Sequence, residues 1–187
     1  MNFYQLFFVN LVINKNTTMK RLVLFSTIAL IFMLIGTACA QKPSPAATAT
    51  GTLQNGTVIT INYSSPALKG RTIGKEVEPM QGKVWRAGAN DATVFEISKD
   101  VTINGKSLPA GKYGFFTINN GTDWTLIFNK TWKQWGAFSY KESDDAIRVN
   151  VAPTTAASSM ERLTYTISST GKVSLNWGTV QVDFNVK

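Results

Sequence analysis

The sequence has no histidine and only one cysteine, Cys39, among its 187 residues. The segment after Cys39 therefore lacks the residues for a Ser-His-Asp triad, for thiol catalysis and for a zinc site built from histidine or cysteine. It can form no internal disulfide, so its stability has to come from a hydrophobic core. It also has neither a Gly-x-Ser-x-Gly elbow nor a glycine-rich phosphate loop.

Acidic residues are the scarcer charged type, with 11 against 19 lysines and arginines, and the formal net charge is +8. Loss of Lys15, Lys20 and Arg21 with an N-terminal leader would leave +5. The basic residues are scattered along the chain, which argues against nucleic acid as a partner. Weak attraction to anionic glycans or membrane surfaces is what this charge predicts.

Long apolar runs are confined to the N-terminal part of the sequence. Met19-Lys20-Arg21 precedes an apolar run over residues 22–35 and a group of small residues. This is the pattern of a secretory signal peptide over residues 19–40, with residues 1–18 as an upstream extension. The run is shorter than the roughly 18–20 residues that span a bilayer, so we expect export to the periplasm or cell surface.

Two processing sites overlap at Cys39. Ala38-Cys39-Ala40 fits ordinary signal peptidase cleavage, which would release a soluble protein. Gly36-Thr37-Ala38-Cys39 resembles a bacterial lipobox, which would make Cys39 the lipidated first residue of an outer-membrane lipoprotein. Gly36 stands where a lipobox usually has leucine, so the sequence favours release, and both outcomes stay open.

The segment after the leader divides into a tether and one domain. Residues 41–50 are rich in Pro, Ala and Thr without apolar periodicity, which indicates a tether. Residues 51–187 have the size of a single domain and contain nine or ten short β-branched or aromatic stretches separated by turn residues. The pattern predicts an all-β domain with little helix, an antiparallel β-sandwich of jelly-roll type.

Two glycines carry specific predictions about turns. Asn104-Gly105 lies between two β-branched stretches and predicts a hairpin over residues 101–108. Gly178 is interpreted as a turn between one strand at 173–177 and another at 179–186.

The stretch 82–93 is the strongest candidate for a binding surface. It places Trp85 and Arg86 before a glycine bend that would return Asn90 toward Arg86, and Arg71 on the preceding long loop is their expected partner. An arginine beside a tryptophan either belongs to a structural network or presents its fork to a carboxylate or a hydroxyl-rich ligand. Both interpretations stay open for these four residues.

The densest aromatic stretch, residues 129–140, is equally ambiguous. Aromatic side chains bind flat apolar faces of sugars, and they also supply most of the buried area in the core of a β-sandwich. We expect Phe138 and Tyr140 in the core. Trp132, which has polar neighbours, is the expected exposed member and a candidate ligand contact.

Carboxylates are the remaining catalytic residue type. A glycosidase needs two of them at a controlled separation, one held protonated. The available residues are Asp91, Glu96, Glu142, Asp144, Asp145 and Glu161. Spacing does not show that any two converge, and Asp144-Asp145 is expected to solvate a turn.

Five blocks of the sequence resemble the signature blocks of the bacterial domain-of-unknown-function family numbered 2911. They are Tyr63-Ser64-x-Pro66-x-x-Lys69-Gly70-Arg71, Gly82-Lys83-Val84-Trp85-Arg86-x-Gly88-Ala89-Asn90-x-Ala92-Thr93, Leu108-Pro109-Ala110-Gly111-x-Tyr113, Trp135-Gly136-Ala137-Phe138-x-Tyr140 and Met160-Glu161-Arg162. The resemblance runs from about residue 47 to residue 186 and implies an exported, β-rich domain. It implies no reaction.

Together these features favour a non-catalytic, exported binding or envelope-associated module. Its expected partner is a glycan or another envelope ligand, with no cofactor, no metal and no nucleic acid, and with membrane contact only through a lipid on Cys39. The alternative is a carboxylate-dependent hydrolase that acts on cell-envelope or extracellular polymers.

Overall fold

The computed structural model describes residues 44–187, and all structural statements below concern that part of the chain. The predicted upstream extension, the predicted signal peptide, Cys39 and the first residues of the predicted tether lie outside it. Residues 41–187 group as one unit, and every buried hydrophobic residue of the described part belongs to that unit. The unit therefore carries its own core. No helix between residues 44 and 187 is long and apolar enough to cross a membrane.

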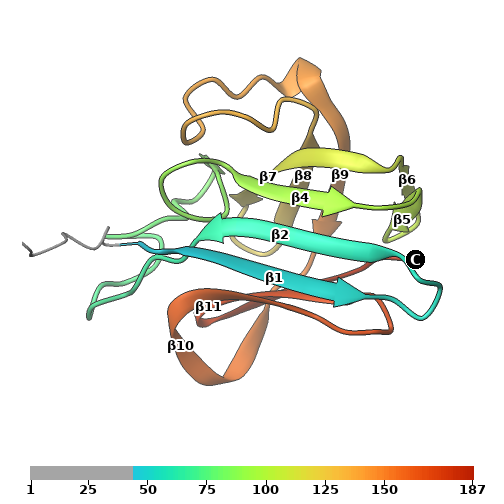
Figure 1. Cartoon of the computed structure of the whole chain (residues 1–187). Helices are drawn as coiled ribbons and strands as arrows, with labels where there is room; N and C mark the ends of the chain where they lie inside the picture. Colours follow the sequence, from blue (N-terminus) through green and yellow to red (C-terminus); the bar gives the residue numbers. More distant parts are fainter. Residues whose placement is uncertain (1–43) are drawn as a thin grey trace, which may run out of the picture. The chain divides into compact units, whose positions relative to one another are not determined.

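The larger sheet is antiparallel and has the strand order β1-β2-β4-β7-β8-β9, with β3 paired to β7 (Figure 1). Short turns connect β1 to β2 and β7 to β8, whereas longer segments connect β2 to β4, β4 to β7 and β8 to β9. The strands are β1 Ala46–Thr52, β2 Val58–Ser64, β3 Val84–Trp85, β4 Thr93–Ile97, β7 Gly111–Asn119, β8 Trp124–Asn129 and β9 Asp145–Val151.

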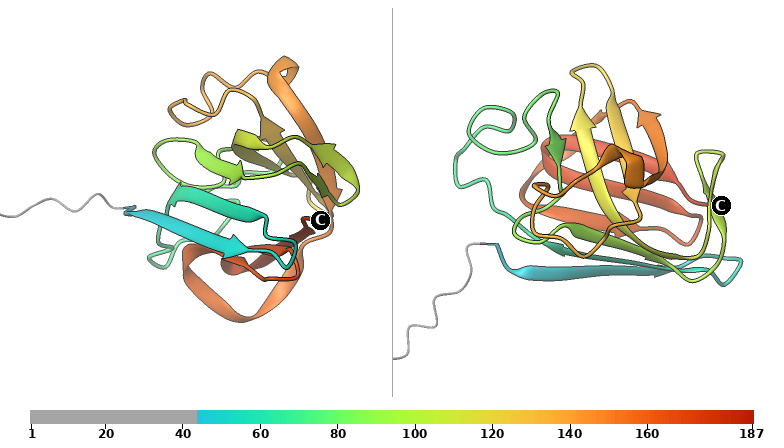
Figure 2. Two further views of the ribbon diagram at one scale, coloured as in Figure 1. Left: turned by 45° about the vertical axis from the view of Figure 1, so that its right-hand side comes forward. Right: turned by 90° about the horizontal axis from the view of Figure 1, so that it is seen from above.

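A long hairpin faces this sheet. Its strands are β10 (Thr154–Ile167) and β11 (Lys172–Asn185), and they lie below β1 and β2 in Figure 1 and behind the main sheet in the right-hand view of Figure 2. A short hairpin of β5 (Val101–Ile103) and β6 (Lys106–Leu108) lies near the C-terminus. The only helical turn between residues 44 and 187 is the 3-10 helix η1, Glu142–Asp144.

The core between the two layers is aromatic at its centre. Phe184 of β11 contacts Phe95, Phe115 and Phe128 of the larger sheet, with ring centroids 5.7 to 6.1 Å apart. All four side chains are at most 2% exposed. Alternation along β4 (buried at 93, 95 and 97) turns every second residue toward this core, as a strand with one covered face requires.

A smaller cluster lies on the opposite face of the larger sheet. Ala92, Phe116 and Ile127 are buried there, and Ala137 and Tyr140 pack against them from the segment that follows β8. Strands β7 and β8 are thus covered on both faces, which explains why their sequences lack clean alternation.

The structure confirms the all-β, antiparallel prediction and the hairpin at Asn104-Gly105, where both residues have positive φ. The described part has eleven strands, one more than the upper prediction.

Two boundary predictions are wrong. The tether prediction fails from Ala46 onward, because β1 pairs with β2 over seven residue pairs and its small residues fit a half-buried edge strand. Gly178 does not end a strand either. It lies inside β11 with φ of 59° at a shift in register, so it accommodates a bulge in a continuous strand.

Candidate functional site

Trp85 belongs to the hydrophobic core. Its side chain is 2% exposed, and its ring lies edge-on to Trp124 at 6.5 Å. The indole Nε1 donates a hydrogen bond to the carbonyl oxygen of Gly88 at 3.0 Å. This placement contradicts the predicted ligand contact, because β3 turns the side chain inward and satisfies its polar atom locally.

The bend after Trp85 is a packed backbone structure. The carbonyl oxygen of Ala87 accepts hydrogen bonds from Thr93 Oγ1 at 3.0 Å and from the hydroxyl of Tyr165 at 2.6 Å. A Cβ atom on Gly88 would lie 2.8 Å from Thr93 Oγ1 and 3.2 Å from the carbonyl oxygen of Ser64. Only glycine fits here, so the bend serves to join β3, β4 and the second layer.

Asn90 has a positional role in the same bend. Its φ of 58° lies in the left-handed region, which asparagine tolerates. Its Nδ2 donates to the carbonyl oxygen of Ser44 and to Ser64 Oγ, both at 3.2 Å. Its own carbonyl oxygen accepts from the backbone N–H of Gly136 at 3.1 Å. Asn90 therefore ties the first described residue to the segment after β8.

Arg86 is half-buried and makes no ion pair within residues 44–187. Its Nε is buried without a hydrogen-bond partner. Burial lowers the pKa of the guanidinium below its ordinary value, and the charge of Glu78 opposes that effect. The side chain passes close to Gly136, where an added Cβ would lie 4.0 Å from Arg86 Cδ. Arg86 and Asn90 thus meet the same segment, residues 130–141.

Arg71 lies in a different place. Its Nε and Nη2 donate to the carbonyl oxygens of Leu68 and Ala67 at 2.9 and 2.8 Å, which fixes the guanidinium against its own loop. The loop itself is held by β10, since the N–H of Leu68 donates to the carbonyl oxygen of Glu161. Arg71 lines a cleft to which neither Arg86 nor Asn90 contributes, so the expected partnership of the three residues is not formed.

The cleft at Arg71 has a volume of about 550 Å³. It is formed by the loop before β3, the β7–β8 turn, the start of β10 and the middle of β11. Its apolar lining includes Leu68, Ile73, Trp124, Pro153 and Val180, and its polar lining consists of Arg71, Thr72, Asn119, Thr154, Thr155, Ser159 and Thr179. The lining thus combines one cation, one amide and five hydroxyl groups with an aromatic side chain, and contains no carboxylate.

The segment 130–141, which we call the aromatic loop, covers the smaller cluster with Ala137 and Tyr140. Its other aromatic side chains face solvent: Trp132 is 37% exposed, Trp135 59% and Phe138 86%. The expected exposure of Trp132 is confirmed, and Lys112 Nζ lies 5.5 Å from its ring centroid. The core placement of Phe138 is wrong, because Gly136, with φ of 61°, turns the chain and Tyr140 fills the space over Phe116 instead.

A family model for proteins of unknown function, DUF2911, matches residues 44–186. The chain belongs to the DUF2911 family. No curated protein and no solved structure matches it.

Four of the five DUF2911 blocks meet in pairs in the fold. The N–H of Lys69 donates to Glu161 Oε1 at 2.8 Å, and Arg162 Nη1 donates to the carbonyl oxygen of Ser65 at 3.0 Å, which joins the first block to the last. The second block meets the fourth where Gly136 bonds to Asn90. These four blocks therefore hold irregular loops against the sheets. This structural role accounts for the blocks without reference to a reaction.

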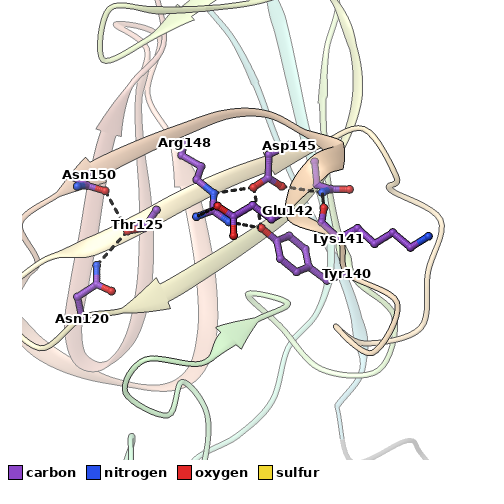
Figure 3. A network of polar contacts seen from close by, with 9 residues as sticks. Asn120, Thr125, Tyr140, Lys141, Glu142, Asp145, Arg148 and Asn150 are labelled. Carbon is purple, nitrogen blue, oxygen red and sulfur yellow. Dashed lines mark hydrogen bonds and ion pairs between the residues drawn. The ribbon is translucent and has the colours of Figure 1, made fainter.

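A polar network that the sequence did not indicate lies on the outer face of the DUF2911 domain, beside the aromatic loop (Figure 3). Asp145 accepts from Arg148 Nε at 2.7 Å, from the hydroxyl of Tyr140 at 2.7 Å and from Asn129 Nδ2 at 2.7 Å. Glu142 binds the same arginine at 3.0 Å through Nη1. The prediction that Asp145 solvates a turn is therefore wrong, because its carboxylate binds three side chains.

The network shifts the titration of its tyrosine. Burial first, and then the hydrogen bond to Asp145, raise the pKa of Tyr140 to about 12, although the hydrogen bond from Arg148 acts in the opposite direction. The hydroxyl therefore stays protonated above the pH at which an ordinary tyrosine ionises. The sequence shows Tyr140, Asp145 and Arg148 within nine residues of one another. Their spacing matches neither a helical nor a strand period, so it did not predict that they form a network.

Proposed function

We propose that the domain is a non-catalytic, exported binding module whose ligand is a hydroxyl-rich envelope glycan held in the Arg71 cleft. The observation that carries this proposal is the lining of that cleft, where hydroxyl groups, an amide and a guanidinium surround a partly apolar floor. Ligand sites combine these properties: an apolar surface for contact area and a few placed polar groups for orientation.

Arg71 supplies the charged recognition group. Its Nε and Nη2 are fixed by main-chain carbonyls, and no residue between 44 and 187 accepts from its Nη1. A pre-positioned guanidinium loses less conformational freedom on binding than a free one. It suits a sugar that carries a carboxylate or phosphate, which would bond to Nη1.

The absence of carboxylates from the cleft lining supports binding over hydrolysis. Glu96 pairs with Lys112, Asp144 accepts from Thr131 Oγ1 and Glu161 accepts from the N–H of Lys69. A sugar in the Arg71 cleft would therefore meet no general acid or nucleophile from the described lining.

Binding of neutral and acidic oligosaccharides by residues 41–187, measured by calorimetry, tests the proposal. Arg71→Ala should weaken binding of an acidic sugar by roughly ten-fold or more, the usual effect of losing a hydrogen bond to a charged group. Thr155→Val tests the hydroxyl contribution without altering the loop. Lys75→Ala is the matched control, because Lys75 is an exposed cation of the same loop outside the cleft. Equal affinities for all four proteins would refute the proposal.

The hydrolase alternative has one observation in its favour, the convergence of Glu142 and Asp145 on Arg148. Asp145 would have to give up its bonds to Tyr140 and Asn129 to act on a substrate. Asp145→Asn and Glu142→Gln should each abolish any hydrolysis of envelope polymers that the domain shows. Unaltered hydrolysis by both variants would remove this candidate.

A further inference from the structure

The aromatic loop exposes large apolar side chains with no described residue over them. Phe138 is 86% and Trp135 59% exposed, whereas Trp132 is partly occupied by Lys112. Packing within the domain does not require this exposure, since Ala137 and Tyr140 already cover Phe116 and Ile127. The exposed surfaces of these two rings therefore contribute no packing to the described domain.

The charge of the loop has one sign. Lys130, Lys133 and Lys141 are exposed, and no acidic residue occurs between 130 and 141. Beyond the loop, Glu142 is engaged with Arg148 and Asp144 with Thr131 Oγ1. Asp91, which pairs with Trp135 in an isolated β-bridge, is an exposed carboxylate beside the loop, and the three lysines outnumber it. Exposed aromatic rings with interspersed lysines are the composition of segments that lie in the interface of an anionic bilayer.

The loop lies beside the point where the described chain begins. Asn90 bonds to the carbonyl oxygen of Ser44 through its side chain and to the N–H of Gly136 through its backbone. Cys39 precedes Ser44 by five positions, and five extended residues reach about 17 Å at most. A lipid on Cys39 would therefore hold the aromatic loop close to the bilayer surface.

We propose that the aromatic loop docks on an anionic phospholipid bilayer, with Trp135 and Phe138 in the interface and Lys130, Lys133 and Lys141 at the headgroups. A lipid anchor on Cys39 and the loop then act on the same surface, so the second contact forms at high effective concentration. Without the anchor the loop gives weaker, reversible binding. In both cases the domain is held in one orientation, because the loop is fixed to the sheet by its own packing.

Co-sedimentation of residues 41–187 with vesicles tests the proposal without any contribution from the leader. The domain should bind vesicles rich in phosphatidylglycerol and stay in solution with phosphatidylcholine alone. Phe138→Ser should lower the partition coefficient by roughly ten-fold or more, as expected for an apolar ring withdrawn from water. Each of Lys130→Gln, Lys133→Gln and Lys141→Gln should lower it about five-fold.

Tryptophan emission gives a second measurement. Trp85, Trp124 and Trp177 are buried, so a blue shift on addition of vesicles would report Trp132 and Trp135. Trp135→Phe should remove most of that shift and retain binding.

Val58→Ser and Lys99→Gln are the matched controls. Val58 and Lys99 are exposed, and both adjoin the β1–β2 turn, away from the aromatic loop. Neither substitution should change the partition coefficient.

Three results would overturn the proposal: no binding to anionic vesicles, equal binding to phosphatidylcholine, or unaltered binding by Phe138→Ser. If the domain does not bind vesicles and the loop variants bind oligosaccharides more weakly than the wild type, the loop is a surface for a glycan ligand and not for a bilayer. The Arg71 cleft has its own variants, so failure of either proposal is recognised independently of the other.

Discussion

At the scale of single residues, the most consequential group is the carboxylate of Asp145. It is 8% exposed as a side chain and is bonded to Arg148, while Tyr140 and Asn129 satisfy its remaining lone pairs. A buried carboxylate with this set of donors is stable, but removal of the charge leaves an arginine without its closest partner. The network therefore makes one attachment of the aromatic loop, the one through Tyr140, dependent on one anion.

Asp145→Asn should lower the free energy of unfolding by about 2 kcal/mol, the range found when a hydrogen-bonded charge loses its partner. Urea denaturation at pH 7 measures this loss. Asp123→Asn is a suitable control. Among residues 44–187, the carboxylate of Asp123 accepts only from the side chain of Asn120, and its main-chain carbonyl accepts from the N–H of the same residue. An unaltered midpoint for Asp145→Asn would show that the network does not contribute to stability.

Tyr140 gives the domain a specific dependence on alkaline pH. Its pKa is raised from 10.0 to about 12 in the folded state, so the unfolded chain releases this proton first as pH rises. The stabilisation is fully present below pH 10 and is lost between pH 10 and about 12.

Tyr140→Phe should cost about 1 kcal/mol near pH 8 because two hydrogen bonds are removed, and the difference from the wild type should shrink above pH 10. Denaturant unfolding at pH 8, 10 and 11 checks this. Tyr165, whose pKa burial raises well above its ordinary range, contributes to the alkaline slope of both proteins. A constant difference across the three pH values would contradict the assigned pKa.

Gly88 is a second residue on which the site region depends. Gly88→Ala should destabilise the domain by about 1–3 kcal/mol, because the new methyl group meets Thr93 Oγ1 at 2.8 Å and the backbone of Ser64 at 3.2 Å. Gly70→Ala is the comparison: its φ is +73° but nothing lies within 4 Å of the added atom, so only conformational strain applies. Thermal unfolding of both variants should rank them in that order.

At the scale of elements, the substitution of phenylalanine by alanine should have different effects on stability in β11 and in the aromatic loop. Phe184→Ala removes a ring that joins β11 to three strands of the larger sheet and should cost about 3–5 kcal/mol. Phe138→Ala removes a ring that is 86% exposed and should cost less than about 0.5 kcal/mol. Equilibrium unfolding of the pair measures the difference, and similar losses would show that the aromatic loop is packed in solution.

The sequence predicted elements best where a local rule was sufficient. Asn104-Gly105 specified its hairpin because two consecutive positive φ values favour that pair. The prediction of a turn at Gly178 was wrong because the positive φ that glycine adopts in a turn also occurs at a bulge inside a strand. Phe138 and Tyr140 were both predicted in the core because aromatic residues usually supply buried area. Only Tyr140 packs there, over Phe116, and no local pattern shows that Phe138 faces solvent after the turn at Gly136.

At the scale of the whole molecule, the cleft shows what a sequence cannot disclose. Its lining comes from residues 68–73, 119–124, 153–159 and 178–180. The pairing of β10 with β11, the β7–β8 turn and the bond from the loop at Leu68 to β10 all contribute to bringing these segments together. Arg71 was identified from its loop alone, but its partners depend on tertiary contacts with no local pattern. The assignment of Arg86 and Asn90 to the same site failed for the same reason.

The start of the domain also follows from whole-molecule pairing. A chain that begins at residue 41 should fold, whereas one that begins at residue 53 lacks β1 and should lose stability or aggregate, because the edge of β2 becomes unpaired. Far-ultraviolet circular dichroism and size-exclusion chromatography of the two proteins check this. Equal behaviour would restore the interpretation of residues 41–50 as a tether.

The position of Phe184 near the C-terminus affects the order of folding. The ring at the centre of the core belongs to β11, which follows all strands of the larger sheet in the chain, so the two layers cannot close until β11 has left the ribosome. Long-range pairing of this kind is slow compared with local hairpin formation. In the newly made chain the larger sheet therefore stays uncovered on its core face until β11 has been made.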